Sequence, residues 1–369
     1  MLQLQEISLE GFKSIQQCDR LRLGSMNVLI GANGSGKSNF ISFFKMLNYA
    51  MSGALGEFVG QVGGANSVLH FGAKKTPELS ATLKFQSDSG LNTYHLRLVH
   101  GARDSLIFGE ESITHQGKHH PKQAQPRVLG SGHKESALLG DEMRDDKTAK
   151  FFRGTLNRCR VYQFHDTSAS AHIRNRVNAN NNRYLMSDGG NLAAVLALMA
   201  AQKKDYYRRI VSTIQLFAPF FADFSLDPLK DNPAQVMLSW RTKGSEYDFG
   251  PHQLSDGTLR MMALTTLLLQ PSEDLPSIIV IDEPELGLHP YAITHLCGLL
   301  SAVAQEHQVI VATQSVPLLN QFEASQVVVV EQRSGITSFA RLEEAPLREW
   351  LQEYSLGELW EKNVLGGRP

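Results

Sequence analysis

A glycine-rich motif between an apolar run and an amphipathic segment constrains the fold of this chain most strongly. Residues 31–38 read G-A-N-G-S-G-K-S, which fits the pattern G-x-x-x-x-G-K-S. The apolar run at 26–30 predicts a buried strand, and the helical spacing of apolar residues over 38–49 predicts a helix. The backbone N–H groups of such a loop and the dipole of the helix that follows both attract an anion. The motif therefore predicts a phosphate-binding P-loop in an α/β fold.

The residue types of this loop indicate which anion it binds. Glycines let the backbone curl so that successive N–H groups point inward at phosphate oxygens. Lys37 is placed to reach the β- and γ-phosphates, and the hydroxyl of Ser38 is placed to ligate Mg²⁺. We therefore expect ATP and Mg²⁺ as ligands. The predicted nucleotide-binding residues of the loop are Asn33, Gly34, Ser35, Gly36, Lys37, Ser38 and Asn39.

Length, charge and cysteine content define the broad class of protein. The chain has 369 residues, a formal net charge of −1 and 42% apolar residues, which fits one large α/β domain with an insertion, or two domains. No apolar run approaches the roughly 20 residues that span a bilayer, and the start of the chain does not read as a signal peptide. Three widely spaced cysteines form no disulfide framework, so we expect a cytoplasmic protein: Cys18, Cys159 and Cys297.

The first two thirds of the chain alternate between β-type and helical patterns. Two strands are expected within 1–30 around a turn at 10–14, and a hairpin is expected over 79–100 around a turn at 87–90. Residues 101–150 are polar and weakly periodic, which predicts a loop-rich insertion. Helical spacing follows over 191–217 and ends at Pro219, and a further hairpin is expected between 236 and 249.

After residue 253 the pattern becomes regular. Helices are expected at 258–269, 290–305 and 317–321, and strands at 277–281, 308–313 and 326–331. Strands that alternate with helices are typical of a parallel sheet covered by helices on both faces.

One segment is strongly basic although the whole chain is nearly neutral. Residues 151–209 carry a net charge of +7, because three aspartates oppose ten basic residues: Arg153, Arg158, Arg160, Arg174, Arg176, Arg183, Lys203, Lys204, Arg208 and Arg209. Such a segment attracts a polyanion such as DNA, or it forms a solvated helical face. Both interpretations remain open at this stage.

A second acidic motif supports the nucleotide prediction. The apolar run at 278–281 ends in Asp282 and Glu283, as in a Walker B element. Ligands bind at the carboxyl edge of the strands in open α/β folds. We therefore expect Asp282 to hold Mg²⁺ together with Ser38, and Glu283 to polarise the attacking water as a general base.

Several motifs together resemble the ABC-type ATPases, and within them the RecF/SMC/OLD-like branch of chromosome-maintenance and phage-defence ATPases. The similarity is closest to stand-alone bacterial ATPases that are classed as AAA-type but built like ABC heads, and it covers nearly the whole chain. Residues 254–260 (L-S-D-G-T-L-R) resemble the ABC signature motif. The other segments that carry the resemblance are 9–15, 161–166, 282–290, 312–315 and 366–369.

The resemblance implies a mechanism. Two heads face each other, and each ATP lies between the P-loop of one head and the signature motif of the other, so Ser255 and Gly257 would meet the γ-phosphate in trans. Gln163 stands where the family places a glutamine that senses Mg²⁺ and the attacking water. Gln314 replaces a histidine that senses the γ-phosphate in many ABC ATPases, which implies slow hydrolysis. His289 is either a contact to the partner or a residue with a capping or packing role.

The resemblance also implies the fold and the organisation. It implies an α/β ABC-ATPase head with a mixed sheet, a P-loop core, an antiparallel β subdomain and a short helical lid insertion. We expect an N-terminal ATPase lobe at 1–100, an insertion with a basic helical lid and linking strands at 101–250, and a C-terminal ATPase lobe at 251–369. 

Two functions agree with these motifs. The first is a homodimeric, Mg-ATP-dependent switch that hydrolyses ATP and acts with DNA in chromosome maintenance, repair or antiviral defence. The second is a regulatory ATPase subunit that holds an effector protein encoded by a neighbouring gene and does not bind DNA.

Overall fold

Contacts within the chain define two compact units. The computed structural model describes residues 2–118 and 124–368; part of the predicted insertion, 119–123, and the end residues 1 and 369 lie outside this description. Unit 1 comprises Met1–Val161, Pro276–Val280 and His307–Pro369, and unit 2 comprises Tyr162–Leu275 and Ile281–Glu306. The lobe and lid roles assigned above to 1–100, 101–250 and 251–369 stay predictions.

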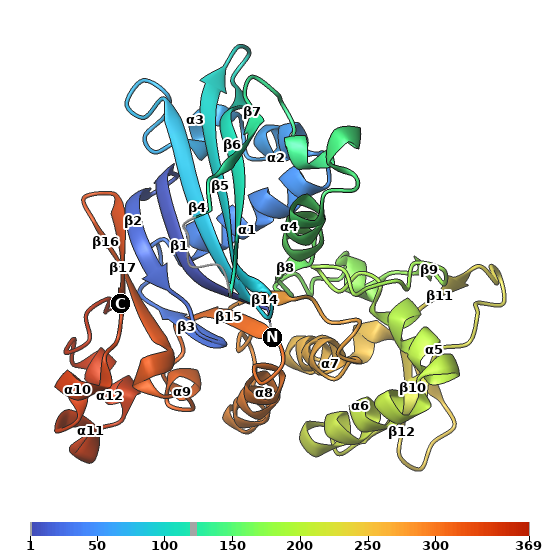
Figure 1. The fold of residues 1–369 in the computed structure, drawn as a ribbon. Coiled ribbons are helices and arrows are strands. Elements are labelled where there is room, and N and C mark those ends of the chain that lie inside the picture. The colour runs from blue at the N-terminus through green and yellow to red at the C-terminus, as the bar shows by residue number, and fades with distance from the viewer. Residues whose placement is uncertain (1, 119–123, 369) are drawn as a thin grey trace. The chain divides into compact units, whose positions relative to one another are not determined.

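Unit 1 contains a six-stranded antiparallel sheet in the order β2-β1-β4-β5-β6-β7 (Figure 1). Both hairpins predicted in this part of the chain are confirmed, since β1 pairs with β2 through Phe12 and Ile15, and β4 pairs with β5 through Ser87 and Gly90. The strands are β1 (Gln3–Phe12), β2 (Ile15–Arg22), β4 (Glu78–Ser87), β5 (Gly90–Gly101), β6 (Ser105–Gly117) and β7 (Arg127–Gly130).

The loop-rich insertion predicted at 101–150 is wrong. Strand β6 pairs along most of β5, and helix α4 (Lys147–Asn157) contacts β6. The prediction failed because β6 buries a carboxylate, which disturbs the apolar pattern. Glu111 is fully buried and accepts hydrogen bonds from the hydroxyls of Tyr94 (2.7 Å) and Ser136 (2.5 Å) and from the N–H of Ala137 (2.8 Å). A charged residue enters a core only with such partners.

The second sheet of the structure has the order β17-β16-β3-β15-β14-β8. Strand β3 is parallel to both β15 and β16, and every residue of β3, β14 and β15 is buried. Burial on both faces explains why these strands read as continuous apolar runs. Strand β17 was missed by the sequence analysis. The strands are β3 (Met26–Ile30), β8 (Cys159–Tyr162), β14 (Ile278–Asp282), β15 (Gln308–Thr313), β16 (Val327–Arg333) and β17 (Ile336–Arg341).

Helix α1 (Lys37–Met51) joins the core of unit 1. Its residues Phe40, Phe43 and Phe44 are buried in one cluster with residues of both sheets, and Phe43 packs edge-to-face on Phe12 at 5.6 Å. This burial fixes the start of α1, and with it the glycine-rich loop. The other helices of unit 1 are α2 (Leu55–Gln61), α3 (Ala65–Val68), α4, α9 (Val316–Leu319), α10 (Glu344–Leu347), α11 (Trp350–Glu353) and α12 (Leu356–Glu361).

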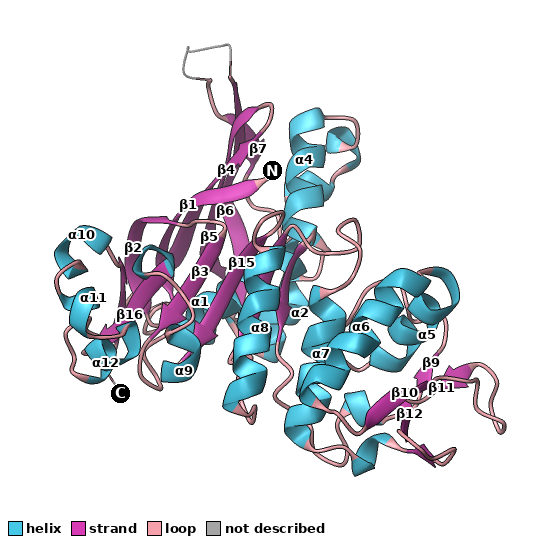
Figure 2. Cartoon of the chain, turned by 90° about the horizontal axis from the view of Figure 1, so that it is seen from below, coloured by secondary structure: helices cyan, strands magenta, loops and turns pink. Residues whose placement is uncertain are grey.

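Unit 2 packs helices against small sheets (Figure 2). The helical pattern at 191–217 forms two helices, with a break at Lys203. The predicted hairpin between 236 and 249 is confirmed by the pairing of β12 with β13. The elements are α5 (Leu192–Gln202), α6 (Lys204–Phe217), α7 (Asp256–Leu268), α8 (Pro290–Val303), β9 (Val177–Asn178), β10 (Phe221–Ser225), β11 (Gln235–Val236), β12 (Ser239–Thr242) and β13 (Asp248–Phe249).

The helices are short and the cysteine thiols are buried. Among the described residues, no helix has the length and apolar character needed to cross a membrane. All three cysteines are free and buried. Burial raises the pKa of Cys18 and of Cys297 to about 12, so both thiols are protonated at neutral pH.

Candidate functional site

The glycine-rich loop lies between β3 and α1, and its glycines are required by the backbone. A Cβ atom on Gly31 would lie 2.2 Å from the carbonyl oxygen of Val330, and one on Gly36 would lie 2.1 Å from Oγ1 of Thr337. Gly34 has φ +78°, and a Cβ atom there would have no neighbour within 4 Å among the described residues. Larger residues are therefore excluded at 31 and 36 by neighbouring strands, and at 34 by backbone strain.

Lys37 is folded back onto the loop. Its ammonium donates hydrogen bonds to the carbonyl oxygens of Gly31 (2.6 Å) and Ala32 (3.0 Å), and the side chain is 5% exposed. A buried cation that is held by carbonyl dipoles inside an N–H cradle favours a polyanion there. The hydroxyl of Ser35 is buried and makes no hydrogen bond with the residues that the structure describes.

Three side chains fasten the loop to its surroundings. The hydroxyl of Thr337 donates to the carbonyl oxygen of Ser35 (3.0 Å) and shares a hydrogen bond with Ser14 (2.8 Å), which also accepts from the amide of Asn39 (2.6 Å). The sequence analysis missed Thr337, because no pattern in β17 links it to residues 300 positions earlier. Asn39 was predicted to bind nucleotide, and in the structure its amide holds Ser14. Ser38, the predicted Mg²⁺ ligand, is exposed on the first turn of α1.

The carboxylate of Asp282 lies at the end of β14 and belongs to unit 2. One of its oxygens, Oδ2, accepts a hydrogen bond from the amide of Gln163 (3.0 Å), and its carbonyl oxygen bonds with Nε2 of His165 (2.9 Å). The other oxygen, Oδ1, is buried and has no hydrogen-bond partner among the described residues. A buried carboxylate oxygen that lacks a donor fits a cation, and carboxylate oxygen is a ligand that Mg²⁺ prefers. The predicted neighbours Asp282 and Gln163 are thus in contact.

Glu283, the predicted general base, has an unusual backbone conformation. Its φ is +41°, in the left-handed region that non-glycine residues rarely adopt. Such a conformation costs about 1–3 kcal/mol and is concentrated at functional sites. This backbone conformation sets the direction in which the side chain leaves the end of β14.

The predicted signature motif forms the start of α7. Ser255 is exposed and caps the helix, since its hydroxyl accepts from the N–H of Thr258 (3.2 Å). Gly257 is required by packing: a Cβ there would lie 2.3 Å from the carbonyl oxygen of Gly287. The loop after Asp282 therefore passes directly over the first turn of the signature helix.

Arg260, the last residue of the motif, ties three segments of unit 2 together. Its guanidinium donates to the carbonyl oxygens of Phe164 (2.9 Å), His165 (2.8 Å) and Leu286 (2.8 Å). It thereby connects the signature helix to the segment of Gln163 and to the loop that follows Glu283. The sequence analysis gave this arginine no role, although it belongs to the quoted motif.

The interpretation of Arg174 as a surface cation is wrong. Its side chain is 5% exposed, and its guanidinium donates to the carbonyl oxygens of Thr167, Pro251 and Leu254 and to the carboxylate of Asp256 (2.8 Å). Each of the last three partners lies within the signature motif or just before it. The sequence shows that Arg174 is a cation, but it does not show that carbonyl groups inside unit 2 accept the hydrogen bonds of the guanidinium.

The remaining predicted residues are placed as follows. Gln314 follows β15 directly, in unit 1, and is half-buried. His289 is a helix cap, because its Nδ1 accepts from the N–H of Tyr291 (3.3 Å) at the start of α8. A pocket of about 240 Å³ opens beside the P-loop and is lined by Ala32, Asn33, Gly34, Ser35, Val330, Glu331, Gln332, Gly367 and Arg368.

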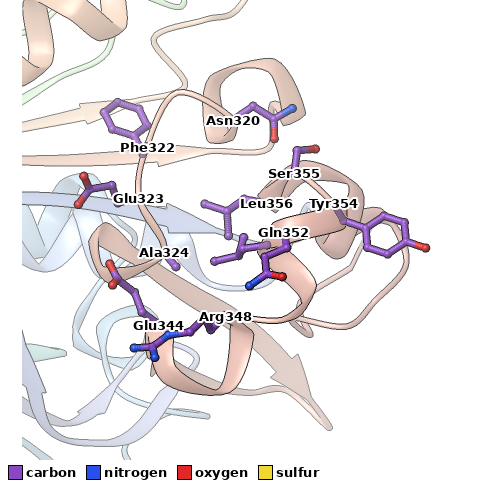
Figure 3. A pocket seen from close by; sticks show the side chains of 11 residues that line it. Asn320, Phe322, Glu323, Ala324, Glu344, Arg348, Gln352, Tyr354, Ser355 and Leu356 are labelled. Atoms are coloured by element: carbon purple, nitrogen blue, oxygen red, sulfur yellow. The ribbon is translucent and has the colours of Figure 1, made fainter.

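A larger hollow of about 510 Å³ lies elsewhere in unit 1 (Figure 3). It is formed around α11 and α12, where Leu356, Gln352 and Ser355 lie close to the segment of Phe322 and Glu323. None of the predicted nucleotide-binding or catalytic residues lines it, so we assign it no part in nucleotide chemistry.

Comparison with protein families identifies the chain. The model of the family described as "AAA domain, putative AbiEii toxin, Type IV TA system" matches residues 26–126 and 162–320, which is more than half of the chain. The chain belongs to this family. It is accordingly an ATP hydrolase, and its resemblance to the SMC- and RecF-like ATPases is confirmed. A comparison with curated proteins gives no match.

Similar solved structures confirm the fold of this AAA-family chain. An SMC head bound to the C-terminal winged-helix domain of ScpA shares 14% identity, with TM-score 0.63, over 94% of this chain and 99% of that one. An SMC head with an extended coiled coil, bound to the C-terminal domain of ScpA from Pyrococcus furiosus, has TM-score 0.58 at 14% identity, over 96% and 99%. The SMC head domain from Thermotoga maritima has TM-score 0.50 at 14% identity, over 92% and 99%. The predicted ABC-ATPase head is thus confirmed as the fold.

Proposed function

We propose that this ATPase is a dimerising switch that closes around two molecules of Mg-ATP. Lys37 and the N–H groups of the P-loop bind the phosphates, Ser38 and Asp282 hold Mg²⁺, and Glu283 polarises the attacking water. A Mg²⁺ ion held by Ser38 and Asp282 would supply positive charge next to the phosphates. Strands β3, β15 and β14 are neighbours in one sheet. The P-loop and Gln314 directly follow β3 and β15 in the chain, and Asp282 is the last residue of β14, which supports this grouping.

The exposed start of α7 supports the trans role of the signature motif. Ser255 is exposed, and the first-turn N–H groups of a 13-residue helix point outward at this end. A hydroxyl and a helix N-terminus together suit the γ-phosphate of a nucleotide bound by a second copy. The γ-phosphate then joins the two subunits, and its release separates them.

Mixing two inactive variants tests the sandwich directly. Lys37→Met removes the phosphate contact and weakens ATP binding by about 10- to 100-fold. Ser255→Arg leaves the P-loop intact but blocks the exposed helix start. Each variant alone should show negligible ATP turnover, whereas a mixture should regain turnover, because each mixed dimer contains one complete site. A mixture that stays as inactive as its components would contradict the trans arrangement.

The proposed cellular role is DNA maintenance or antiviral defence, with DNA as the ligand of the ATP-bound dimer. On α6, Lys204, Arg208 and Arg209 are exposed, although Arg208 lies 3.3 Å from Asp205. Reversal of two charges, Arg208→Glu with Arg209→Glu, should weaken DNA binding. It should also reduce the slope of the logarithm of the binding constant against the logarithm of the salt concentration by about two, because two phosphate contacts are lost. Lys134→Glu, an exposed residue outside the segment, is the control.

The alternative is a regulatory subunit that holds an effector protein. The family description names a toxin of a toxin–antitoxin system, and two similar SMC heads are bound to domains of ScpA, which favours protein partners. DNA binding that is absent, or unchanged by both the charge reversal and added salt, supports this alternative. Capture of one defined protein by the ATP-bound dimer is its positive test.

A further inference from the structure

The sequence motifs assign no role to a short segment that lies against the P-loop. We call residues 366–368 the strap. The carbonyl oxygen of Gly367 accepts hydrogen bonds from the N–H of Ala32 (3.1 Å) and from the indole N–H of Trp360 (3.1 Å), and Trp360 is 1% exposed. The same carbonyl group of the strap thus binds a buried tryptophan and the phosphate loop.

The path of the strap depends on two glycines. Gly366 and Gly367 have φ values of +78° and +63°. A Cβ atom on Gly367 would lie 2.8 Å from Cγ1 of Val329 and 3.2 Å from the carbonyl oxygen of Val330. Two successive residues in the left-handed conformation cost conformational energy for any amino acid other than glycine. The close approach of the strap to Val329 and Val330 therefore requires these two glycines.

Helix α12, whose Trp360 binds the strap, also packs against α9. The N–H of Gly357 donates to Oδ1 of Asn320 (2.7 Å), and a Cβ atom on Gly357 would lie 2.4 Å from Cγ1 of Val316. Val316 is the first residue of α9, which begins directly after Gln314 and Ser315. Through α12 and α9, the strap is therefore connected to the segment that carries the proposed phosphate-sensing glutamine.

Charge makes Arg368 a candidate ligand for an anion. It lines the 240 Å³ pocket together with Ala32, Asn33 and the carboxylate-bearing residue Glu331. Arg333 forms an ion pair of 3.0 Å with Glu331, which offsets part of that negative charge. The side chain of Arg368 makes no hydrogen bond or ion pair within the described part of the chain, so its guanidinium is available beside the loop.

We propose that Arg368 is a nucleotide-binding residue, whose guanidinium the strap places on the polyphosphate held by the P-loop. Arginine presents a planar set of donors that matches two phosphate oxygens, and it keeps its charge at every accessible pH. It would add a cation to the site from outside the P-loop. This role of Arg368 rests on the proposed nucleotide site, and its test separates the two.

Titration of Mg-ATP by calorimetry tests the role of Arg368. Arg368→Ala should weaken binding about tenfold, and Arg368→Lys should weaken it less. The control Arg103→Ala, an exposed arginine of unit 1, should bind as the wild type does. If the wild type binds no nucleotide, or if Lys37→Met binds as tightly as the wild type, the nucleotide site itself is wrong. If Lys37→Met loses binding while Arg368→Ala retains it, only the role of Arg368 is overturned.

Shorter ligands test which part of the nucleotide Arg368 contacts. The loss caused by Arg368→Ala should persist with ADP and vanish with adenosine, because the guanidinium binds phosphate. An equal loss with adenosine would overturn the phosphate contact.

A second variant displaces the strap and leaves Arg368 unchanged. Gly367→Ala should weaken ATP binding as Arg368→Ala does, because the added methyl group meets Val329. Gly132→Ala is the matched control, with φ +84° and no atom within 4 Å of the new Cβ. Equal ATP affinity of the two glycine variants would contradict the proposed placement.

Discussion

Replacement of Glu283 by glutamine is expected to lower ATP turnover by about 10²- to 10⁴-fold, which is the usual contribution of a general base. Glutamine keeps the size and the hydrogen-bonding geometry of the side chain but cannot accept the proton of the attacking water. Binding of Mg-ATP should be unchanged, because the P-loop is not altered. Turnover is measured as phosphate release, with the exposed Glu306→Gln as the matched control.

The same variant should accumulate as a dimer in the presence of ATP. Without hydrolysis the γ-phosphate stays between the two copies, so ATP should shift the mass measured by light scattering from monomer to dimer. A Glu283→Gln protein that binds ATP and stays monomeric at micromolar concentration would contradict the switch.

The variant Glu283→Gly distinguishes the catalytic role of the Glu283 carboxylate from the effect of its strained backbone on stability. Glycine removes the carboxylate, so turnover should fall as far as in Glu283→Gln. Glycine also adopts φ +41° without strain. The relief of this backbone strain exceeds the loss of stability that comes from the greater conformational entropy of glycine in the unfolded chain. We expect the free energy of unfolding in urea to rise by up to about 1 kcal/mol. Glu306→Gly, whose φ is not positive, should lower it instead.

Replacement of Arg174 by alanine is expected to destabilise unit 2 by about 1–3 kcal/mol, the cost of leaving buried hydrogen-bond acceptors without a donor, since its ionic partner Asp256 is 61% exposed. The variant leaves the carboxylate of Asp256 and the carbonyl oxygens of Pro251 and Leu254 without their donor. Arg174→Lys should be nearly as unstable, because one ammonium cannot reach oxygens that a planar guanidinium bridges.

Arg176→Ala is the matched control, two residues away. Its ion pair with Asp231 is exposed on both sides, so its loss should leave stability nearly unchanged. Urea unfolding is followed by the fluorescence of Trp240, after Trp350 and Trp360 are replaced by phenylalanine, since Trp240 is the tryptophan of unit 2. Equal stability of the Arg174 and Arg176 variants would contradict the structural role of Arg174.

Arg174→Ala should also lower ATP turnover without weakening ATP binding. The guanidinium holds the segment just before Ser255, so its removal disorders the signature motif and leaves the P-loop of unit 1 intact. Loss of ATP binding equal to the loss of turnover would show a more general defect.

The sequence determined the elements whose patterns are local. The P-loop, the strands that are buried on both faces and the first hairpins were predicted with nearly their observed bounds, because glycine spacing and apolar periodicity are set by neighbours in the chain. The motifs around Asp282 and Ser255 likewise identified the ATPase family and the fold. Strand β6 and strand β17 were missed, since a buried, fully bonded Glu111 and a short exposed edge strand lack the expected alternation.

Only the tertiary structure decided what the polar residues do. Arg174 reads as a surface cation, yet buried carbonyl groups surround it; Thr337 reads as an ordinary strand residue, yet it holds the P-loop. The phosphate contact predicted for Gly257 stays a prediction, and the structure adds that its missing side chain lets the loop at Gly287 pass. The reason is physical: the free energy of a polar or charged group depends on the partners that surround it, and those partners come from distant parts of the chain. Apolar periodicity can be read directly from the sequence, whereas hydrogen-bond partners are brought together only when the chain folds.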